Sequence, residues 1–410
     1  MSNEKLHIGH KQTPIGKIPK EWEIRRFATI CEFRRGFSYR SDQLSSNMTQ
    51  FRFITINDVE KEGGLKRIAK KIYLSKDEQV SSEFFVENGD VLIANTDMAK
   101  GFIIGAPILI KNMAEKCVYS MDLTKLIFDK SKIDSEFLFY CLTYNPIRQK
   151  MKASAQGTNV LHLNHGVVGN FSISLPPLLE QQKIAEILST VDDAIQKVDE
   201  IIEKTERLKK GLMQELLTKG IGHKEFKDTE IGRIPKDWEV VKVGNILSLE
   251  YGKGLPERER ISGDYPVVGS NGIVGYHNKA LVKGPGIVVG RKGTIGAVSW
   301  IDQDFWPIDT TYYVKPKISN IFLRWLFYKL TYLNPAKFHL ADVVPGLKRE
   351  LVHSLKMSLP SLSEQQKIVE MLSSVDEKLE LERKRKEKLE RIKKGLMNDL
   401  LTGRKRVKVI

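Results

Sequence analysis

Paired cysteines, long apolar runs and a leader-like N-terminus are all missing from this 410-residue sequence. Its three cysteines, Cys31, Cys117 and Cys141, stand far apart without metal-ligand spacing, so we interpret them as reduced thiols that fill a core. Segment 1–12 is polar and lacks the apolar centre of a secretory signal. The most apolar run, 101–110, is too short to span a bilayer. These absences predict a cytoplasmic protein that does not enter the membrane.

Signatures of an active site are missing as well. Gly252-Lys253-Gly254 lacks the rest of a dinucleotide-binding fingerprint, and the sequence contains no Walker loop and no nucleophile elbow. Asn145-Pro146 and Asn334-Pro335 lack the second proline and the aromatic residue of an amino-methyltransferase signature. His162 and His165 have no matched ligand pair, which favours a role in a loop or in the fold over a metal site. The sequence therefore predicts a protein that is not an enzyme and binds no metal.

Acidic residues are too few to balance the basic ones. The chain has 66 Lys and Arg against 51 Asp and Glu, a formal net charge of +15. Such a surplus suits a polyanion, because each neutralised phosphate releases bound counterions. A ribosome-associated or other basic protein would share it. The surplus is +6 in each of the regions 1–174 and 229–358. Charge thus makes nucleic acid a candidate partner without deciding the matter.

What the chain does contain is a long internal repeat. The motif Leu175-Pro-Pro-Leu-Leu-Glu-Gln-Gln-Lys-Ile184 returns 184 residues later as Leu359-Pro-Ser-Leu-Ser-Glu-Gln-Gln-Lys-Ile368. Between residues 175 and 218, 25 of 44 positions are identical to their partners without a gap, which chance does not produce. A second repeat relates 15–24 to 231–240, at a separation of 216.

The two separations differ because the material between the repeated blocks differs in length. Residues 25–174 and 241–358 are variable inserts that match only sparsely. One echo is Leu142-Thr-Tyr-Asn-Pro146 against Leu330-Thr-Tyr-Leu-Asn-Pro335, each at the end of a candidate helix, 134–152 or 319–333. We expect the inserts to share a fold, built from short strands and a terminal helix, while they present different surfaces.

Each repeated block of about forty residues predicts a long helix, roughly 60 Å in length. Its apolar residues step by alternating three and four positions, as in a coiled coil. Pro176-Pro177 precedes the first start, Ser363 and Gln366 fit a capping box at the second, and Gly220 and Gly403 fit the stops. The predicted seam consists of Ile184, Leu188, Val191, Ile195, Val198, Ile202 and Leu208 in the first helix and Ile368, Leu372, Val375, Leu379, Leu389 and Ile392 in the second.

Pairing of these two seams predicts the architecture. An antiparallel pair places one insert at each end and gives the molecule internal pseudo-two-fold symmetry. The fold class is therefore α+β, with two globular α/β domains separated by two long antiparallel helices that form a coiled coil. The expected segments are 1–24 (an N-terminal segment of which 229–240 is a repeat), 25–174 (first domain), 175–228 (central helix), 229–358 (second domain) and 359–410 (C-terminal helix).

Three stretches of the inserts are candidates for contact with DNA. Arg34 to Arg40 interleaves cations with aromatic residues, which suits phosphate and base-edge contact as well as an ordinary solvated loop. Gly290 to Gly296 offers backbone amides beside two cations, so it could hold a phosphate or be a structural glycine hairpin. The glycine-rich stretch after Tyr251 is a weaker third candidate. The candidate residues are Arg34, Arg35, Tyr39, Arg40, Lys253, Arg258, Arg260, Arg291 and Lys292.

The duplicated motifs resemble those of the specificity subunits of type I restriction–modification enzymes. Leu-Pro-Pro-Leu-x-Glu-Gln-Gln-Lys-Ile opens a long helix twice, and Ile-Pro-x-x-Trp-Glu precedes each insert. Val344-Pro-Gly-Leu347 and Gly290-Arg-Lys-Gly-Thr-Ile-Gly296 fit the same family. The resemblance covers nearly the whole chain and implies that each insert is a target recognition domain for half of a split DNA site.

The resemblance also implies partners. Double-stranded DNA, two methyltransferase (modification) subunits and restriction subunits would assemble with this chain, and the conserved helices would set the gap between half-sites and dock the methyltransferases. S-adenosylmethionine, Mg²⁺ and ATP would be bound by those partners, with no cofactor in this chain. Two alternatives stay open: a stand-alone tandem DNA-binding regulator, which would bind its site tightly without partners, and a structural coiled-coil scaffold, which would not retain specific DNA.

Overall fold

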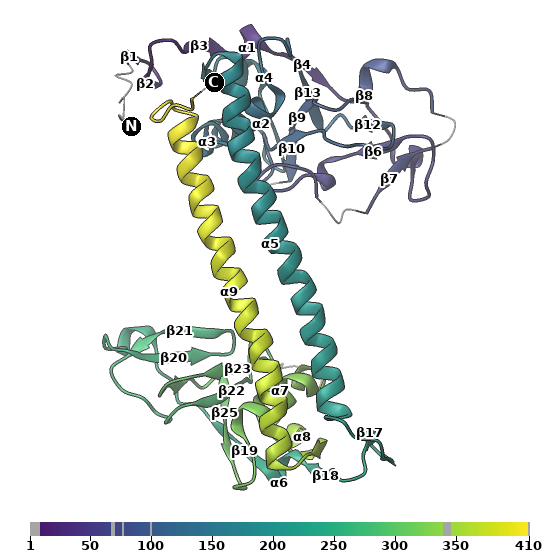
Figure 1. Cartoon of the computed structure of the whole chain (residues 1–410), viewed down its shortest axis with the longest axis vertical. Helices are drawn as coiled ribbons and strands as arrows, with labels where there is room; N and C mark the ends of the chain where they lie inside the picture. Colours follow the sequence, from purple (N-terminus) through teal and green to yellow (C-terminus); the bar gives the residue numbers. More distant parts are fainter. Residues whose placement is uncertain (1–8, 67–69, 76–77, 99–100, 339–345, 409–410) are drawn as a thin grey trace, which may run out of the picture. The chain divides into compact units, whose positions relative to one another are not determined.

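Two units make up the described chain. The computed structural model describes residues 9–66, 70–75, 78–98, 101–338 and 346–408. Unit 1 consists of Met1–Lys197 and Lys386–Ile410, and unit 2 of Val198–Arg385. Each unit contains one insert and part of both long helices, α5 (Leu178–Thr218) and α9 (Leu362–Leu400) (Figure 1). Both predicted long helices are thereby confirmed.

The ends of these helices follow ordinary capping rules. Gly220 and Gly403 have φ angles of +70° and +69°, the left-handed conformation expected just beyond a helix C-terminus. The start of α9 corrects one prediction, because Ser363 already lies inside the helix. The Ser361 hydroxyl accepts the N–H of Glu364 at 3.3 Å and is the true cap. Pro360 immediately precedes it, so the helix begins two residues earlier than the capping box at Ser363 suggested.

Segments of α5 and α9 pair antiparallel inside each unit. In unit 1, Asp192 of α5 forms an ion pair with Lys393 of α9 at 2.6 Å. In unit 2, Lys209 pairs with Asp376 at 2.5 Å and Glu206 with Arg383 at 2.7 Å. In unit 2, residue numbers rise along one helix as they fall along the other. In unit 1 the same follows from the Asp192–Lys393 pair and from the packing of the start of α5 against the end of α9. The predicted antiparallel pairing is confirmed within both units.

Most of the predicted seam is buried or half-buried, but two positions are exposed. Leu208 is 55% exposed and Ile392 is 44% exposed, so both predictions were wrong. Each precedes a lysine, Lys209 or Lys393, that turns toward an aspartate of the other helix. Adjacent helical residues point about 100° apart, so the preceding apolar side chain faces away. The buried members are Ile184, Leu188, Val198, Ile368, Leu372 and Leu379, and the half-buried ones are Val191, Ile195, Ile202, Val375 and Leu389.

The insert of unit 1 is built on two sheets. One four-stranded sheet has the order β11-β9-β13-β4, and a five-stranded sheet has the order β5-β7-β6-β12-β8. Strand β9 is Val-Leu-Ile-Ala and fully buried, as expected for a central strand. The strands are β4 (Glu32–Arg35), β5 (Leu44–Ser45), β6 (Arg52–Ile54), β7 (Ile72–Leu74), β8 (Phe85–Val86), β9 (Val91–Ala94), β11 (Pro107–Leu109), β12 (Cys117–Tyr119) and β13 (Leu123–Ile127).

The insert of unit 2 repeats the same plan with fewer strands. Its four-stranded sheet has the order β19-β25-β22-β23, which matches β4-β13-β9-β11 strand by strand. In the second sheet, β20 pairs parallel with β24, as β6 pairs with β12 in unit 1. The expectation that the inserts share a fold is confirmed. The strands are β19 (Leu247–Tyr251), β20 (Tyr265–Gly269), β21 (Gly272–His277), β22 (Gly286–Gly290), β23 (Val298–Ile301), β24 (Trp306–Pro307) and β25 (Thr311–Pro316).

The remaining described α-helices and strands complete the inserts or connect them to the long helices. The helix predicted over 134–152 is split at Tyr144 into α2 and α3, because Pro146 follows and cannot continue the first helix. In unit 1 these remaining α-helices and strands are β1 (His10–Thr13), β2 (Gly16–Pro19), β3 (Glu23–Arg26), α1 (Phe27–Ile30), β10 (Thr96–Met98), α2 (Ser135–Thr143), α3 (Asn145–Ala153), β14 (Val160–His162), α4 (His165–Gly169) and β15 (Ser172–Leu175). In unit 2 they are β16 (Phe226–Thr229), β17 (Gly232–Pro235), β18 (Glu239–Lys242), α6 (Val243–Ile246), α7 (Leu323–Leu333), α8 (Arg349–Ser354) and β26 (Lys356–Leu359).

The repeated sequence motifs make the same contacts in both units. The indole N–H of Trp22 donates to Glu180 at 3.0 Å, and that of Trp238 donates to Glu364 at 2.8 Å. These contacts join the tryptophan of Ile-Pro-x-x-Trp-Glu to the glutamate of Leu-Pro-x-Leu-x-Glu-Gln-Gln. Both tryptophans are almost fully buried. The repeat therefore encodes a packing joint that closes each insert onto the start of its long helix.

A buried lysine holds the C-terminal end of α5 in unit 2. Lys329 is 3% exposed, and its ammonium donates to the Leu217 carbonyl at 2.7 Å and the Ser358 hydroxyl at 2.9 Å. In unit 1 the equivalent residue is Cys141, and Ser174 donates directly to the Leu401 carbonyl at 3.0 Å. Burial lowers the pKa of Lys329 from 10.5 to about 7.

This lysine predicts a pH-dependent stability. Between pH 7 and 10.5 the unfolded chain binds more protons at residue 329 than the folded chain does. The free energy of unfolding therefore rises with pH in that window, by up to about 1.4 kcal/mol per pH unit. Lys329→Cys, which copies unit 1, should remove this contribution. Urea unfolding of both proteins at pH 7, 8 and 9 measures it, and a difference between them that does not change with pH would contradict a lysine that loses its proton.

Candidate nucleic-acid interface

A tyrosine close to two guanidinium groups marks one end of the four-stranded sheet of unit 2. Tyr251, the last residue of β19, is half exposed, and its ring lies 5.3 Å from the Arg291 guanidinium and 5.2 Å from that of Arg349. The Tyr251 ring contacts the Tyr312 ring, and their centroids are 5.0 Å apart. Burial, followed by the hydrogen bond with Tyr251, raises the pKa of Tyr312 to about 12, so this hydroxyl stays neutral and donates to Leu347. The arrangement presents a half-exposed aromatic ring beside two guanidinium groups, which suits a nucleic acid.

Two more cations lie on the loops that end at this site. Lys253 follows β19, and its backbone N–H donates to the Pro307 carbonyl. Lys292 follows β22, and its backbone N–H donates to the Thr310 carbonyl. Both side chains are exposed. Part of the Arg291 guanidinium is already hydrogen-bonded within the protein, because its Nε and Nη2 donate to the Asp309 carbonyl at 3.1 and 2.8 Å. The structure thus brings together three of the predicted residues, Lys253, Arg291 and Lys292, from two separate stretches of sequence.

The other two predicted residues of unit 2 belong to the loop between β19 and β20. Arg258 has an 85% exposed side chain beside Glu259 at 3.7 Å. Arg260 donates to the carbonyls of Leu255 at 3.3 Å and Val274 at 2.8 Å. The Arg260 guanidinium therefore ties this loop to β21. Arg258 is the freer of the two cations for a ligand.

The equivalent region of unit 1 has a different character. Arg35 ends β4 as Tyr251 ends β19, and its Nε donates to the Met121 carbonyl at 3.0 Å. Tyr39 is half-buried against Phe53 at 4.8 Å and donates weakly to Asp122 at 3.5 Å. Arg34 lies 3.5 Å from Glu32, and the highly exposed Arg40 lies 3.5 Å from Asp42. Arg35 and Arg40 are the exposed cations of this group.

A neutral histidine stands where unit 2 has Arg349. His165 begins α4 as Arg349 begins α8, and its ring stacks on Phe33 at 5.2 Å with an interplanar angle of 15°. Its Nε2 lies 3.1 Å from the Thr124 hydroxyl. Burial first, and then the charge of Arg35, lowers the pKa of His165. Unit 1 therefore presents a less cationic surface at this position than unit 2 does.

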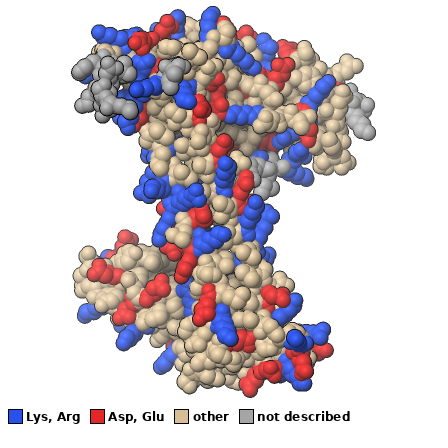
Figure 2. Space-filling model, viewed as in Figure 1, with Lys and Arg blue, Asp and Glu red and all other residues tan. Residues whose placement is uncertain are grey.

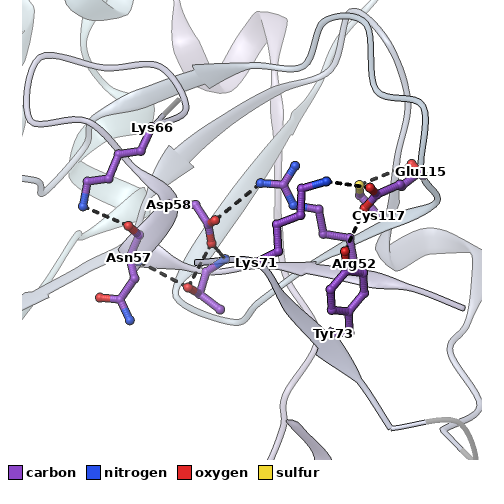
Figure 3. Close-up of polar contacts among 9 residues, drawn as sticks. Arg52, Asn57, Asp58, Lys66, Lys71, Tyr73, Glu115 and Cys117 are labelled. Carbon is purple, nitrogen blue, oxygen red and sulfur yellow. Dashed lines mark hydrogen bonds and ion pairs between the residues drawn. The ribbon is translucent and has the colours of Figure 1, made fainter. Parts of the chain in front are cut away.

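A second group of charged side chains in unit 1 is paired internally (Figure 3). The half-buried Arg52 and the buried Asp58 lie 3.5 Å apart, and Asp58 also accepts the N–H of Thr55 at 2.8 Å. Lys71 pairs with Glu115 at 2.6 Å across the same small sheet. The first pair joins Asp58 to a residue of β6, and the second joins the residue before β7 to the segment before β12. These charges are thus paired within the insert.

Charge alone does not locate the interface. Figure 2 shows Lys and Arg side chains interspersed with Asp and Glu over both units on the face that is drawn.

The described residues hold no group of three or more metal-ligating side chains, and His162 and His165 are not part of one. Cys31, Cys117 and Cys141 are buried and unpaired, as predicted for core residues. In the described part of the chain, no helix has the length and apolarity needed to cross a membrane.

Sequence reasoning missed Tyr251 and Arg349 as site residues. Tyr251 directly precedes the glycine-rich stretch that was singled out, and Arg349 follows the Val-Pro-Gly-Leu motif by two positions. Both signals were present, but neither says that β19 and α8 meet. Contact of Tyr251 with Arg349 depends on the fold of the insert, which a local pattern does not contain.

Comparison with known proteins decides the family. The model for the type I restriction modification DNA specificity domain matches residues 19–207 and 235–391. The chain is 32% identical over 430 residues to the putative type I restriction enzyme MjaX specificity subunit of Methanocaldococcus jannaschii, covering 97% of each chain. This chain belongs to the type I restriction–modification specificity family. Another relative in this family, the MjaVIII specificity subunit of the same organism, is 27% identical and covers 96% of this chain and 95% of its own.

Solved structures of specificity subunits share the fold. The S subunit of a type I restriction–modification system from M. genitalium superposes with a TM-score of 0.63 at 16% identity, covering 98% of both chains. A chain from a structure of type I R-M complex assembly and conformational transition gives 0.52 at 16% identity, covering 94% of this chain and 99% of its own. The predicted family and α+β fold class are confirmed.

Proposed function

We propose that this chain is the DNA-sequence specificity subunit of a type I restriction–modification complex. Each insert contacts one half of a split DNA site, and the paired helices α5 and α9 set the gap and dock methyltransferase subunits. The observation that carries the proposal is the duplication: two inserts of one fold, joined to identical packing contacts, end in unlike side chains. Recognition of two different half-sites requires a repeated scaffold that carries two different contact surfaces.

The chemistry of the described residues fits recognition without catalysis. Exposed arginine and lysine side chains at the sheet ends neutralise phosphates, while arginine and polar side chains contact base edges. Joining two weak half-site contacts in one chain raises affinity by about 10²–10⁴ through effective concentration. Methyl transfer and cleavage, with S-adenosylmethionine, Mg²⁺ and ATP, then belong to the modification and restriction subunits.

Mapping methylated adenines tests the proposal. The full chain is expressed together with the methyltransferase that co-purifies with it, and host DNA is sequenced for methylated adenine. We expect one split target with two defined half-sites and a constant gap, and loss of that methylation when this chain is omitted. Tight binding of a site by the chain alone, with no methyltransferase partner and no new methylation, would favour a stand-alone tandem regulator.

A further inference from the structure

The loop between β22 and β23 in unit 2 is shaped by three glycines. A Cβ on Gly290 would lie 2.2 Å from the Thr294 carbonyl oxygen, and one on Gly296 would lie 2.1 Å from the Ala336 nitrogen. Gly293 has a φ of +75°, the left-handed conformation that glycine adopts without strain. The loop therefore folds tightly back on itself and exposes its backbone at Gly293.

Two backbone donors at the tip of this loop have no acceptor among the described residues. The N–H groups of Arg291 and Lys292 both bond Thr310, at 2.9 and 3.1 Å, and that of Gly296 bonds Gly290 at 2.8 Å. Those of Gly293 and Thr294 make no such bond in the described part of the chain. Lys292, which is exposed, directly precedes Gly293 in the chain, and the Ser270 hydroxyl would lie 3.1 Å from a Cβ on Gly293. Adjacent free amides next to a cationic residue in a glycine loop suit an anion.

The matching loop of unit 1 carries its own side-chain carboxylate at this place. There the carboxylate of Asp97 accepts the N–H of Ile103 at 2.7 Å. Ile103 corresponds to Thr294, because the Ala106 N–H bonds its carbonyl at 2.7 Å just as the Ala297 N–H bonds that of Thr294 at 3.4 Å. Unit 1 thus satisfies this amide with its own side chain, whereas the Thr294 amide of unit 2 has no acceptor among the described residues and lies two positions after Lys292.

We propose that the loop Gly290–Gly296 of unit 2 binds one phosphate of the DNA backbone, through the amides of Gly293 and Thr294 and the ammonium of Lys292. This inference rests on the proposed function, since it assigns one contact of the DNA-binding unit. A phosphodiester has the charge and the several acceptor oxygens that two amides and one ammonium satisfy. The contact is asymmetric, because Asp97 closes the equivalent position of unit 1.

Salt-dependent binding tests the contribution of Lys292. The full chain assembled with its methyltransferase binds a duplex that carries the mapped target, and affinity is measured by fluorescence anisotropy at several salt concentrations. Lys292→Gln should weaken target and non-target duplexes by the same factor and reduce the slope of log K against log salt by about 1. Lys292→Asp, which imitates the internal anion of unit 1, should weaken binding further. Lys315→Gln is the matched control, because this exposed lysine lies at the opposite end of β25.

Chemical neutralisation of single phosphates locates the contact. Each phosphate in the half-site of unit 2 is replaced in turn by an uncharged methylphosphonate. We expect one position at which the wild-type assembly loses affinity and the Lys292→Gln assembly loses no more. If Lys292→Gln changes the salt slope but its loss adds to that of every methylphosphonate, Lys292 acts through the overall charge of the duplex, and the assignment to one phosphate is overturned.

The two proposals fail in different ways. An assembly that selects no split target contradicts the proposed function itself. An assembly that selects its target while Lys292→Gln behaves like Lys315→Gln contradicts only the phosphate contact. Thermal unfolding of both variants verifies that these exposed substitutions leave the fold unchanged.

Discussion

Replacing Trp238 by alanine is expected to lower the free energy of unfolding of unit 2 by about 3–5 kcal/mol. The side chain is 1% exposed and packs in the core that includes Leu217 of α5 and Ile368 and Leu372 of α9. Its removal leaves a cavity at the joint between the insert and both long helices. Urea unfolding of the full chain, followed by tryptophan fluorescence and circular dichroism, measures the loss.

The loss of stability should exceed that caused by a cavity alone, because the Trp238 indole also donates one of the hydrogen bonds that the Glu364 carboxylate accepts. Glu364 accepts the Trp238 indole at 2.8 Å, the Ile221 N–H at 2.9 Å and the His223 ring at 2.8 Å. Trp238→Phe keeps most of the volume and should cost about 1–3 kcal/mol through the lost indole donor. Trp300→Ala, at a half-buried tryptophan of the same unit, is the matched control. Equal losses for Trp238→Ala and Trp300→Ala would mean that the repeated tryptophan is not a structural joint.

Local patterns predicted the elements whose determinants are local. The apolar spacing, Pro176-Pro177 and the terminal glycines Gly220 and Gly403 are all present in the sequence, and both long helices begin and end within three residues of the predicted signals. The seam was less predictable. Lys209 and Lys393 turn toward aspartates on the other helix, and the spacing of apolar residues does not reveal that choice.

The candidate site was harder to predict, because the sequence does not say which cations are free. Arg260 and Arg291 bond backbone carbonyls, and Arg34 lies beside Glu32, while Lys253 and Lys292 are exposed. Val274 lies on β21 and Asp309 on the loop between β24 and β25, so the partners of Arg260 and Arg291 are distant in the sequence. A basic stretch therefore indicates where DNA contacts gather, whereas the fold decides which side chains remain available for them.

Lengthening both long helices by seven residues is expected to change the DNA target without changing either half-site. We would insert one heptad after Lys197 and one after Arg385, where the chain passes between units, so that neither unit loses a residue. Seven residues extend a helix by about 10 Å, or about three base pairs at 3.4 Å per pair, and a heptad keeps the apolar seam in phase. The accepted gap should grow by about three base pairs. Methylation should also slow, because the added pairs rotate one half-site relative to the other.

The matched control is a heptad in α5 alone. It puts the two seams out of register, so we expect loss of the target and not a new gap. Shorter inserts of three or four residues in both helices should also be poorer than seven, because they rotate the seam away from its partner.

Sequencing of methylated adenines in cells that carry the double-heptad chain and its methyltransferase tests the central claim most directly. That claim is that the inserts recognise bases while the helix pair measures the distance between them. The account predicts the wild-type half-sites separated by a longer gap. A gap of unchanged length with altered half-sites would contradict it.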